Sequence, residues 1–295
     1  MKLSFTKYQG TGNDFIVIDA LDGLPVVDWA TTAAFLCDRH YGVGADGVLL
    51  VERGRRAAFA MRVVNADGSE PEMCGNGIRC VARWLADRGL VTTGPFEVET
   101  AAGLIRPEVL PDRHVRVDMG RPRLRRADIP MAGPPDEQVI EEPMGAGFGT
   151  VLVTAVSMGN PHAVIFVPDV DRIELADWGP RVERHDVFPQ RTNVEFVQVM
   201  GPNHANMRVW ERGAGVTLAC GTGACAALVA GVLTGRLERE AVIHLPGGPL
   251  AIRWDADDHV WLTGPADPVF VGEVTLPHER REAAAPPIQH SPPHS

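Results

Sequence analysis

Two cysteines, Cys74 and Cys220, occur in the same short sequence, Cys-Gly-x-Gly, and each precedes a stretch with the pattern of a helix. A thiol at the start of a helix meets unpaired backbone N–H groups and the positive end of the helix dipole, and both favour the thiolate. The glycines leave the backbone bare, so its N–H groups can approach a carboxylate closely. The pattern predicts two acid–base thiols beside a site for a small anion.

A matched pair of thiols suits one kind of reaction, the inversion of a carbon centre. One thiolate removes a proton while the other thiol delivers a proton to the opposite face, and the unperturbed thiol pKa of ~8.5 is close enough to neutrality for both roles. Backbone N–H groups from two helix starts would stabilise the charge that spreads from an α-carbon into its carboxylate. We therefore expect epimerisation or racemisation of an amino acid without a cofactor.

Other uses of cysteine fit the sequence less well. A single free cysteine is most often a packed core residue, but the repeated Cys-Gly-x-Gly context argues against that for this pair. No C-x-x-C motif is present, and no His/Cys cluster has the spacing of metal ligands, so we expect neither redox chemistry nor a metal. The three remaining cysteines are assigned to packing: Cys37, Cys80 and Cys225.

The chain contains an internal duplication. The segments 61–80 and 207–226 both begin with Met-Arg-Val, and their Cys-Gly-x-Gly motifs are 146 positions apart. GTGNDFIVID around Asn13 resembles SMGNPHAVIF around Asn160. Two homologous halves commonly meet at a cleft, and such clefts are favoured ligand sites.

Both halves show the same predicted order of elements. Helices are expected at 28–39 and 171–184, and a central helix after each cysteine, the first ending at Gly89. Alternating strands are expected at 46–52, 57–64, 193–199 and 205–210. The predicted fold is α+β: two pseudo-symmetric halves, each a curved, mostly antiparallel sheet wrapped around a central helix. The expected domains are 1–119, completed by about 265–276, and 120–264. We expect a loop at 131–149 and a disordered tail at 277–295.

The overall composition limits the partners. The formal net charge of the 295 residues is -10, which disfavours nucleic-acid binding. The N-terminal sequence lacks the features of a signal peptide, and no stretch approaches the ~18 apolar residues of a membrane span. We expect a cytoplasmic protein without a membrane partner.

Several motifs closely resemble those of the diaminopimelate epimerases. They are GTGNDFIVID, RHYGVGADG, NADGSEPEMCGNGIRC, MGNPH, RTNVEF and ERGAGVTLACGTGACA, with a weaker GPADPVFVGE that continues to Glu273. The resemblance covers nearly the whole chain except the tail. It implies the diaminopimelate epimerase-like fold and an isomerase, independent of pyridoxal phosphate, that interconverts LL- and meso-diaminopimelate in lysine and peptidoglycan-precursor synthesis.

The resemblance also implies roles for individual residues. Cys74 and Cys220 would be the acid–base pair, and His162 and Glu211 would set their protonation. The reacting carboxylate would be held by Gly75, Asn76, Gly221 and Thr222. The rest of the substrate would be bound by Asn13, Asn65, Asn160, Asn193, Glu211 and Arg212.

The chemistry of these side chains fits their implied roles. Arg212 can clamp a carboxylate and Glu211 can pair with an ammonium. Glu211 aligns with Asn65 across the repeat, so a symmetric cleft would read its substrate in one direction. Gly47 stands where some family members carry a glutamine, so only a backbone contact is expected from it. A homodimer is implied, with Phe270 as the interface aromatic.

Two other interpretations stay open. Proline or hydroxyproline racemases share the two-thiol logic but typically carry MCGHG, where this chain has Asn76. A non-catalytic amino-acid-binding protein of the same fold would have no need for two matched thiols.

Overall fold

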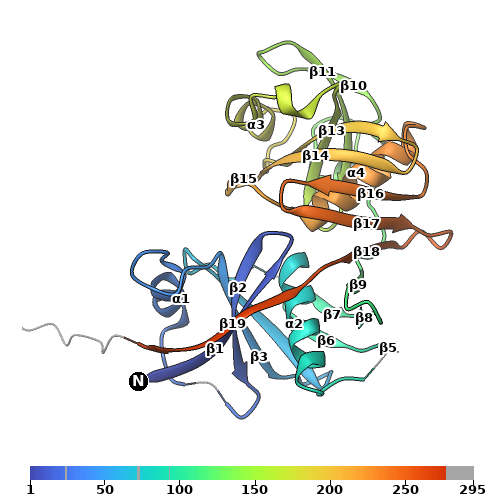
Figure 1. Cartoon of the computed structure of the whole chain (residues 1–295). Coiled ribbons are helices and arrows are strands. Elements are labelled where there is room, and N and C mark those ends of the chain that lie inside the picture. The colour runs from blue at the N-terminus through green and yellow to red at the C-terminus, as the bar shows by residue number, and fades with distance from the viewer. Residues whose placement is uncertain (24, 72–73, 93, 277–295) are drawn as a thin grey trace, which may run out of the picture.

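The computed structural model describes residues 1–23, 25–71, 74–92 and 94–276. The predicted disordered tail at 277–295 lies outside the described residues. Figure 1 shows two halves stacked one above the other, each with a helix against a twisted sheet. The fold is α+β, as predicted.

Two helices, one in each half, form the centres around which the sheets curve. They are α2 (Gly75–Asp87) and α4 (Gly221–Leu233), and residues of α4 from Gly223 to Gly231 are buried without interruption. A helix that is apolar on all sides is stable only when it is enclosed on all sides. Both helices are followed by a glycine at positive φ, Gly89 at 68° and Gly235 at 69°, where the left-handed conformation ends a helix.

The two sheets run in the same order. The first has seven strands, β19-β1-β2-β3-β4-β6-β7. Its bounds are Asp267–Thr275, Lys2–Gly10, Asn13–Ala20, Gly47–Arg53, Phe59–Asn65, Val98–Thr100 and Gly103–Ile105. The second begins β10-β11-β12-β13-β14-β16-β17, with β15 beside β14. Its bounds are Glu142–Gly145, Thr150–Ser157, Pro161–Phe166, Asn193–Gly201, His204–Glu211, Glu240–Leu245 and Gly248–Trp254, and Gly215–Thr217 for β15.

The pairing directions repeat as well. In both sheets an antiparallel hairpin is followed by a parallel pair, β2 with β3 and β12 with β13. Phe15 lies opposite Gly47 in the first parallel pair, and His162 lies opposite Asn193 in the second. The sequence repeat is therefore a repeat of strand register, which makes residues of the two halves directly comparable.

A helix also covers the outer face of each sheet. These are α1 (Trp29–Cys37) and α3 (Leu175–Glu183), preceded by a short 3-10 turn η2 (Val170–Arg172). Separate apolar clusters fill the space under the outer helix and the space around the central helix. Each half is thus three layers deep, and apolar side chains pack its central helix against the sheet.

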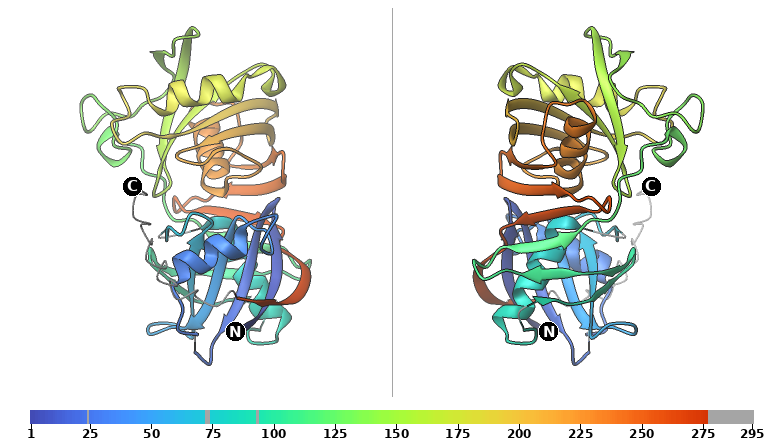
Figure 2. Two further views of the ribbon diagram at one scale, coloured as in Figure 1. Left: turned by 90° about the vertical axis from the view of Figure 1, so that its left-hand side faces the viewer. Right: turned by 90° about the vertical axis from the view of Figure 1, so that its right-hand side faces the viewer.

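Strands also connect the two halves. The second sheet continues from β17 through β18 (Val260–Gly264) to β9 (Val115–Asp118), β8 (Pro107–Val109) and β5 (Gly94–Pro95). In the other direction β19 crosses back and pairs with β1. Figure 2 shows the orange-red strand β18, which pairs with β9, at the boundary between the halves in both views. The division of the chain at residues 119 and 120 stays an interpretation of the repeat.

One expectation was wrong. The segment 131–149, expected to be a loop, contains β10, which pairs with β11 at the edge of the sheet. The strand has only four residues, and the Pro- and Gly-rich sequence around it gave no sign of a strand. The short 3-10 turn η1 (Arg126–Asp128) precedes this segment. None of the described helices is long and apolar enough to cross a membrane.

Candidate active site

Cys74 forms the N-terminal cap of α2. Its backbone is extended, with φ at -137°, and its Sγ accepts a hydrogen bond from the backbone N–H of Gly77 at 3.3 Å. A Cβ at residue 77 would lie 3.3 Å from this sulfur, so the glycine gives the thiol its room. The helix therefore supplies one of its unpaired donors to the sulfur, which is the arrangement that favours a thiolate.

Cys220 takes the same place at the start of α4, with φ at -130°. Its neighbours differ, because its sulfur lies 3.5 Å from the hydroxyl of Thr222 and makes no side-chain cap bond to the helix backbone. Cys220 is 5% exposed, whereas Cys74 is half-buried. The two thiols thus occupy equivalent positions in different surroundings.

The first turns of α2 and α4 are in contact. The Asn76 side-chain amide donates to the carbonyl oxygen of Ala219 at 3.4 Å and to Asn13 Oδ1 at 3.1 Å. A Cβ at Gly221 would lie 3.7 Å from Asn76 Oδ1. The fold therefore brings together three predicted site residues, Asn13, Asn76 and Gly221, from segments far apart in the chain.

Behind this contact lies the buried side chain of Arg79. Its guanidinium donates to Thr11 Oγ1 at 2.6 Å, Asn76 Oδ1 at 3.0 Å, and the carbonyl oxygens of Pro265 and Gly75 at 3.2 Å and 3.3 Å. Burial lowers the pKa of this guanidinium. Arg79 was missed by the sequence reasoning, although an arginine in the first two turns of a buried helix is an unusual feature that could have indicated it.

Burial dominates the protonation of both thiols. It raises the pKa of Cys74 and raises that of Cys220 well above its usual value. The charge of Glu211 raises the pKa of both thiols further. The expected lowering by the helix starts is present, but it is smaller than the cost of removing a thiolate from water. Both thiols are therefore neutral in the unliganded chain, and a base is needed to ionise either one.

Glu211 is suited to be that base. Burial raises the pKa of its carboxyl, while hydrogen bonds from Thr217 and Cys220 oppose that rise. The Thr217 hydroxyl donates to Oε1 at 2.5 Å. A carboxyl poised in this way can exchange a proton with the Cys220 thiol.

Asn193 orders the loop that carries Arg212. Its side-chain amide donates to the Pro161 carbonyl oxygen at 2.8 Å and accepts from the backbone N–H of Arg212 at 2.9 Å. The Arg212 guanidinium donates to the carbonyl oxygen of Gln190 at 3.2 Å. Both ends of the Asn193 side-chain amide thus bind backbone atoms. The Arg212 guanidinium has further N–H groups, besides the one that binds Gln190, with which it could bind a ligand.

Three of the remaining predicted residues, Asn13, Gly47 and Asn65, lie at one end of the neighbouring strands β2, β3 and β4. Asn65 belongs to a turn in which its amide donates to Ser69 Oγ at 3.0 Å, and Asn13 donates to Asp46 Oδ2 at 2.6 Å. Gly47 is buried in β3 opposite Asn65. Phe270 lies on β19, away from the two helix starts, and is 47% exposed.

His162 and Asn160 connect to Cys220 through a buried chain of hydrogen bonds. His162 Nε2 lies 2.9 Å from Asn160 Oδ1, and Asn160 Nδ2 donates to Thr222 Oγ1 at 3.4 Å. His162 Nδ1 lies 2.7 Å from Oε1 of Glu195, a residue that the sequence reasoning missed. The sequence feature that could have indicated Glu195 is a carboxylate inside the apolar strand NVEFVQV, because a buried charge needs a partner.

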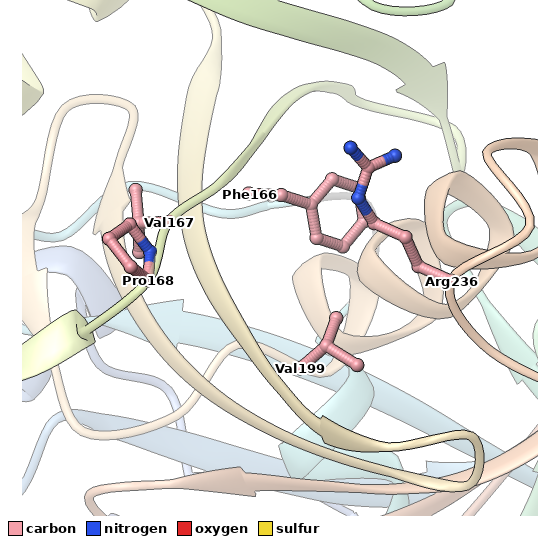
Figure 3. Close-up of a pocket in the computed structure, with 5 residues that line it drawn as sticks. All are labelled: Phe166, Val167, Pro168, Val199 and Arg236. Carbon is pink, nitrogen blue, oxygen red and sulfur yellow. The ribbon is translucent and has the colours of Figure 1, made fainter.

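A hollow of 320 Å³ lies elsewhere on the second half (Figure 3). Its lining includes Phe166, Val199 and Arg236 and none of the predicted site residues. The Arg236 guanidinium stacks over Phe166 at 4.9 Å and pairs with Glu141 at 2.6 Å. Its charge is already balanced, so we assign no chemistry to this hollow.

Comparison of the fold with solved structures identifies proteins of the same architecture. A PhzF-family phenazine biosynthesis protein from Bacillus anthracis superposes with a TM-score of 0.69 at 16% identity, covering 94% of this chain and 100% of that one. A probable proline racemase from Agrobacterium radiobacter gives 0.69 at 16%, covering 93% of each chain. These likenesses concern the fold, which is the predicted one.

Sequence comparison is more specific. Proteins named diaminopimelate epimerase from Pelotomaculum thermopropionicum and a Synechococcus strain are 52% and 54% identical over 276 and 278 residues, covering 92% of this chain and 98% of theirs. A chloroplastic diaminopimelate epimerase from Oryza sativa subsp. japonica is 53% identical over 92% of this chain and 79% of its own. The family model described as diaminopimelate epimerase matches residues 5–125 and 154–269. The chain belongs to the diaminopimelate epimerase family.

Proposed function

We propose that this enzyme interconverts LL-2,6-diaminopimelate and meso-diaminopimelate by moving a proton at the α-carbon between Cys74 and Cys220, without a cofactor. The observation that carries the proposal is the contact between the first turns of α2 and α4, each capped by one of the two thiols. Family membership supplies the substrate.

The proton must first leave one buried thiol. Glu211 accepts the proton of Cys220, and the thiolate so formed removes the α-proton from one face of the substrate. Cys74 delivers its proton to the opposite face, and the bond from Gly77 N–H then stabilises the thiolate left behind. The reverse reaction exchanges the two roles, as microscopic reversibility requires.

The reacting carboxylate would lie between the two helix starts. The first-turn backbone of Gly75, Asn76, Gly221 and Thr222 offers N–H groups that no helical carbonyl can pair. Two helix dipoles would then face the charge that builds up on the carboxylate as the proton leaves. The thiols need no metal or electron sink in this scheme, because the backbone itself stabilises the carbanion.

The distal end of the substrate would be read by unmatched residues. Arg212 would bind the second carboxylate, and Asn13, Asn65, Asn160 and Asn193 would bind or support the polar groups around it. In the first half, Asn65 takes the place of Glu211. Only one orientation of the substrate therefore gives its charged ammonium and carboxylate groups oppositely charged partners. A small-molecule substrate of this kind puts the enzyme in lysine and peptidoglycan-precursor synthesis, in the cytoplasm.

A homodimer is part of the proposal, with β19 at the interface. This strand lies at the edge of its sheet, and Val269, Phe270 and Val271 are 56%, 47% and 77% exposed. An exposed apolar edge strand invites pairing with another chain. Phe270 packs edge-to-face on Phe5 at 5.8 Å, so the aromatic is presented in a fixed position.

The direct test is exchange of the α-proton in heavy water. We expect deuterium to enter the α-position of diaminopimelate and the LL and meso forms to interconvert, with a chelator present and no pyridoxal phosphate added. Cys74→Ala and Cys220→Ala should each abolish inversion.

Three outcomes would contradict all or part of the proposal. Inversion of proline with no reaction of diaminopimelate would favour a racemase of the neighbouring type. Binding of diaminopimelate without exchange at any pH would favour a binding protein. Full inversion by either cysteine variant would eliminate the two-thiol mechanism alone and leave the substrate assignment intact.

A further inference from the structure

We propose that Glu195 is a positioning residue for Cys220, acting through His162, Asn160 and Thr222, and that this chain of residues makes the two catalytic thiols inequivalent. The inference rests on the proposed acid–base role of Cys220.

Glu195 and His162 form a pair that is closed off from solvent. Both side chains are 0% exposed, and Glu195 Oε1 lies 2.7 Å from His162 Nδ1. The other oxygen, Oε2, has no hydrogen-bond partner among the described residues. A buried carboxylate with one oxygen unpaired is costly, so the pair demands a functional explanation.

The pair lies directly beneath the first turn of α4. A Cβ at residue 223 would lie 2.7 Å from Glu195 Oε1, so only a glycine leaves space for the carboxylate there. Gly223 follows Cys220 in the Cys-Gly-x-Gly motif. In this half, the second glycine of the motif therefore makes room for a charged group as well as for the thiol.

The first half has the same positions filled with apolar side chains. Strand register makes Phe15 the equivalent of His162 and Leu49 the equivalent of Glu195. The space between helix and strand is also narrow here, because a Cβ at Gly77 would lie 3.0 Å from Leu49 Cδ2. A charged pair has replaced an apolar pair behind one thiol only.

The polarity of the hydrogen bonds shows what the charged pair does. In the orientation that the structure assigns to the Asn160 amide, Nδ2 donates to Thr222 and Oδ1 faces His162. Both ring nitrogens of His162 then face oxygen atoms, Glu195 Oε1 at 2.7 Å and Asn160 Oδ1 at 2.9 Å, and in this arrangement both donate.

The last contact of this series of hydrogen bonds is with the sulfur of Cys220. Because Thr222 Oγ1 accepts from Asn160, its own hydrogen is free to point at Cys220 Sγ, 3.5 Å away. A hydroxyl that donates to the sulfur stabilises the thiolate. The charges of Glu211 from β14 and Glu195 from β13 raise the pKa of the Cys220 thiol, and the hydrogen bond with Thr222 from α4 lowers it. His162 from β12 is the partner of Glu195 and acts on Cys220 only through Asn160 and Thr222. Among the described residues, the charge of Glu211 raises the pKa of Cys74, and groups of its own helix, Gly77, Asn76 and Arg79, lower it.

Glu195→Gln tests this series of hydrogen bonds, because it removes the carboxylate with little change in side-chain volume. Without the carboxylate, His162 Nδ1 loses its acceptor. Asn160 then turns to donate to Nε2, and Thr222 donates to Asn160 in place of Cys220. We expect alkylation of Cys220 by iodoacetamide at pH 8, followed by peptide mass spectrometry, to slow about tenfold. Alkylation of Cys74 in the same samples should stay within about twofold, which makes it the internal control.

Two further measurements keep the inference testable. The imidazole ¹⁵N signals of His162, assigned by their loss in His162→Asn, should be those of a doubly protonated ring in the parent and of a neutral ring in Glu195→Gln. The double variant His162→Phe, Glu195→Leu copies the apolar pair of the first half, so it should fold even if Glu195→Gln does not. Its Cys220 should also alkylate more slowly.

For diaminopimelate turnover by Glu195→Gln, kcat should fall about tenfold while KM changes less than about threefold, because Glu195 does not reach the substrate. Equal or faster alkylation of Cys220 in both variants would overturn the inference. Faster alkylation would mean that Glu195 acts mainly through its charge, which raises the pKa of Cys220. Alkylation and ¹⁵N spectra are read on the enzyme without substrate, so they decide this point even if diaminopimelate proves not to be the substrate.

Discussion

The side-chain amide of Asn76 donates to the carbonyl oxygen of Ala219 across 3.4 Å, and this bond ties the first turn of α2 to the residue that precedes Cys220. The other end of the amide, Oδ1, accepts from Arg79 at 3.0 Å. The guanidinium therefore fixes the orientation of the amide that joins the two helix starts. The spacing of the thiols depends on a buried cation that touches neither sulfur.

Arg79→Lys should lower both stability and activity. A lysine keeps the positive charge, but its three donors radiate from one atom and cannot serve four oxygens that surround a planar fork. Buried acceptors left unpaired should lower the free energy of unfolding by about 2–4 kcal/mol, measured by urea denaturation. Arg88→Lys, at an exposed site on the same helix, is the control and should cost about 0.5 kcal/mol. Equal costs for both variants would contradict the role given to Arg79.

Gly247→Ala should disturb the contact between the halves. A Cβ at this position would collide with the backbone carbonyl of Thr11, which belongs to the first half and cannot yield as a side chain would. We expect a fall in Tm and a loss of inversion of at least tenfold. Gly201→Ala is the matched control, because a Cβ there meets open space. If both variants kept full activity, the turn at Gly247 would not be needed to bring the halves together.

The repeat explains how much of this could be read from the sequence. Two copies of Cys-Gly-x-Gly at one offset fix two helix starts, and the α+β fold with central helices follows from the alternation around them. The strand β10 was missed because its four residues, which include a proline and a glycine, are too few to carry a periodic signal. The roles of Arg79 and Glu195 were missed for another reason. Each is a charge inside an apolar element, and its meaning lies in partners that only the folded chain brings near.

The protonation of the thiols also needed the structure. A helix start favours a thiolate, and that part of the expectation holds for the bond from Gly77 to Cys74. Burial raises the thiol pKa at both sites, and this effect is larger than the lowering by the helix start. A thiolate removed from water loses more solvation free energy than one or two N–H groups restore. Depth of burial is set by the packing of the two halves against each other, which no local motif encodes.

Thr217→Val should shift the acid limb of the pH–rate profile to higher pH. The Thr217 hydroxyl donates to Glu211 and opposes the rise in carboxyl pKa that burial causes. Without that donor the pKa of Glu211 rises further, so the carboxylate form that accepts the Cys220 proton is lost at a higher pH. The acid limb of kcat/KM should move up by about one unit. Thr217→Ser keeps the hydroxyl and should keep the parent profile. An unchanged limb in Thr217→Val would argue that Glu211 is not the base.

Val271→Lys should produce a monomer. Val271 is 77% exposed on the edge strand β19, so a lysine there costs the protomer little but opposes pairing with a second copy. Phe270 is a poorer choice, because its ring packs on Phe5 within the protomer. Sedimentation velocity should show a dimer for the parent and a monomer for the variant. Met200→Lys adds the same charge at a position 56% exposed in the other half and should leave the dimer intact. A dimer in both variants would exclude β19 as the interface.

Cys80→Ala should cost stability near neutral pH and recover part of it in alkali. Burial raises the pKa of the Cys80 thiol from its usual 9.0 to about 12, with the charge of Arg79 partly opposing the rise. A folded-state pKa above the unfolded value gives stability that is complete below about pH 9 and is lost as the pH rises toward 12. Each pH unit in that window removes about 1.4 kcal/mol for such a thiol. An alanine does not titrate, so the free energies of unfolding of parent and variant should converge between pH 9 and pH 10.5. Cys37→Ala should behave alike over a narrower window, because the pKa of Cys37 is raised only to about 11. A constant gap between parent and Cys80→Ala across this range would mean that the Cys80 thiol ionises as it does in the unfolded chain.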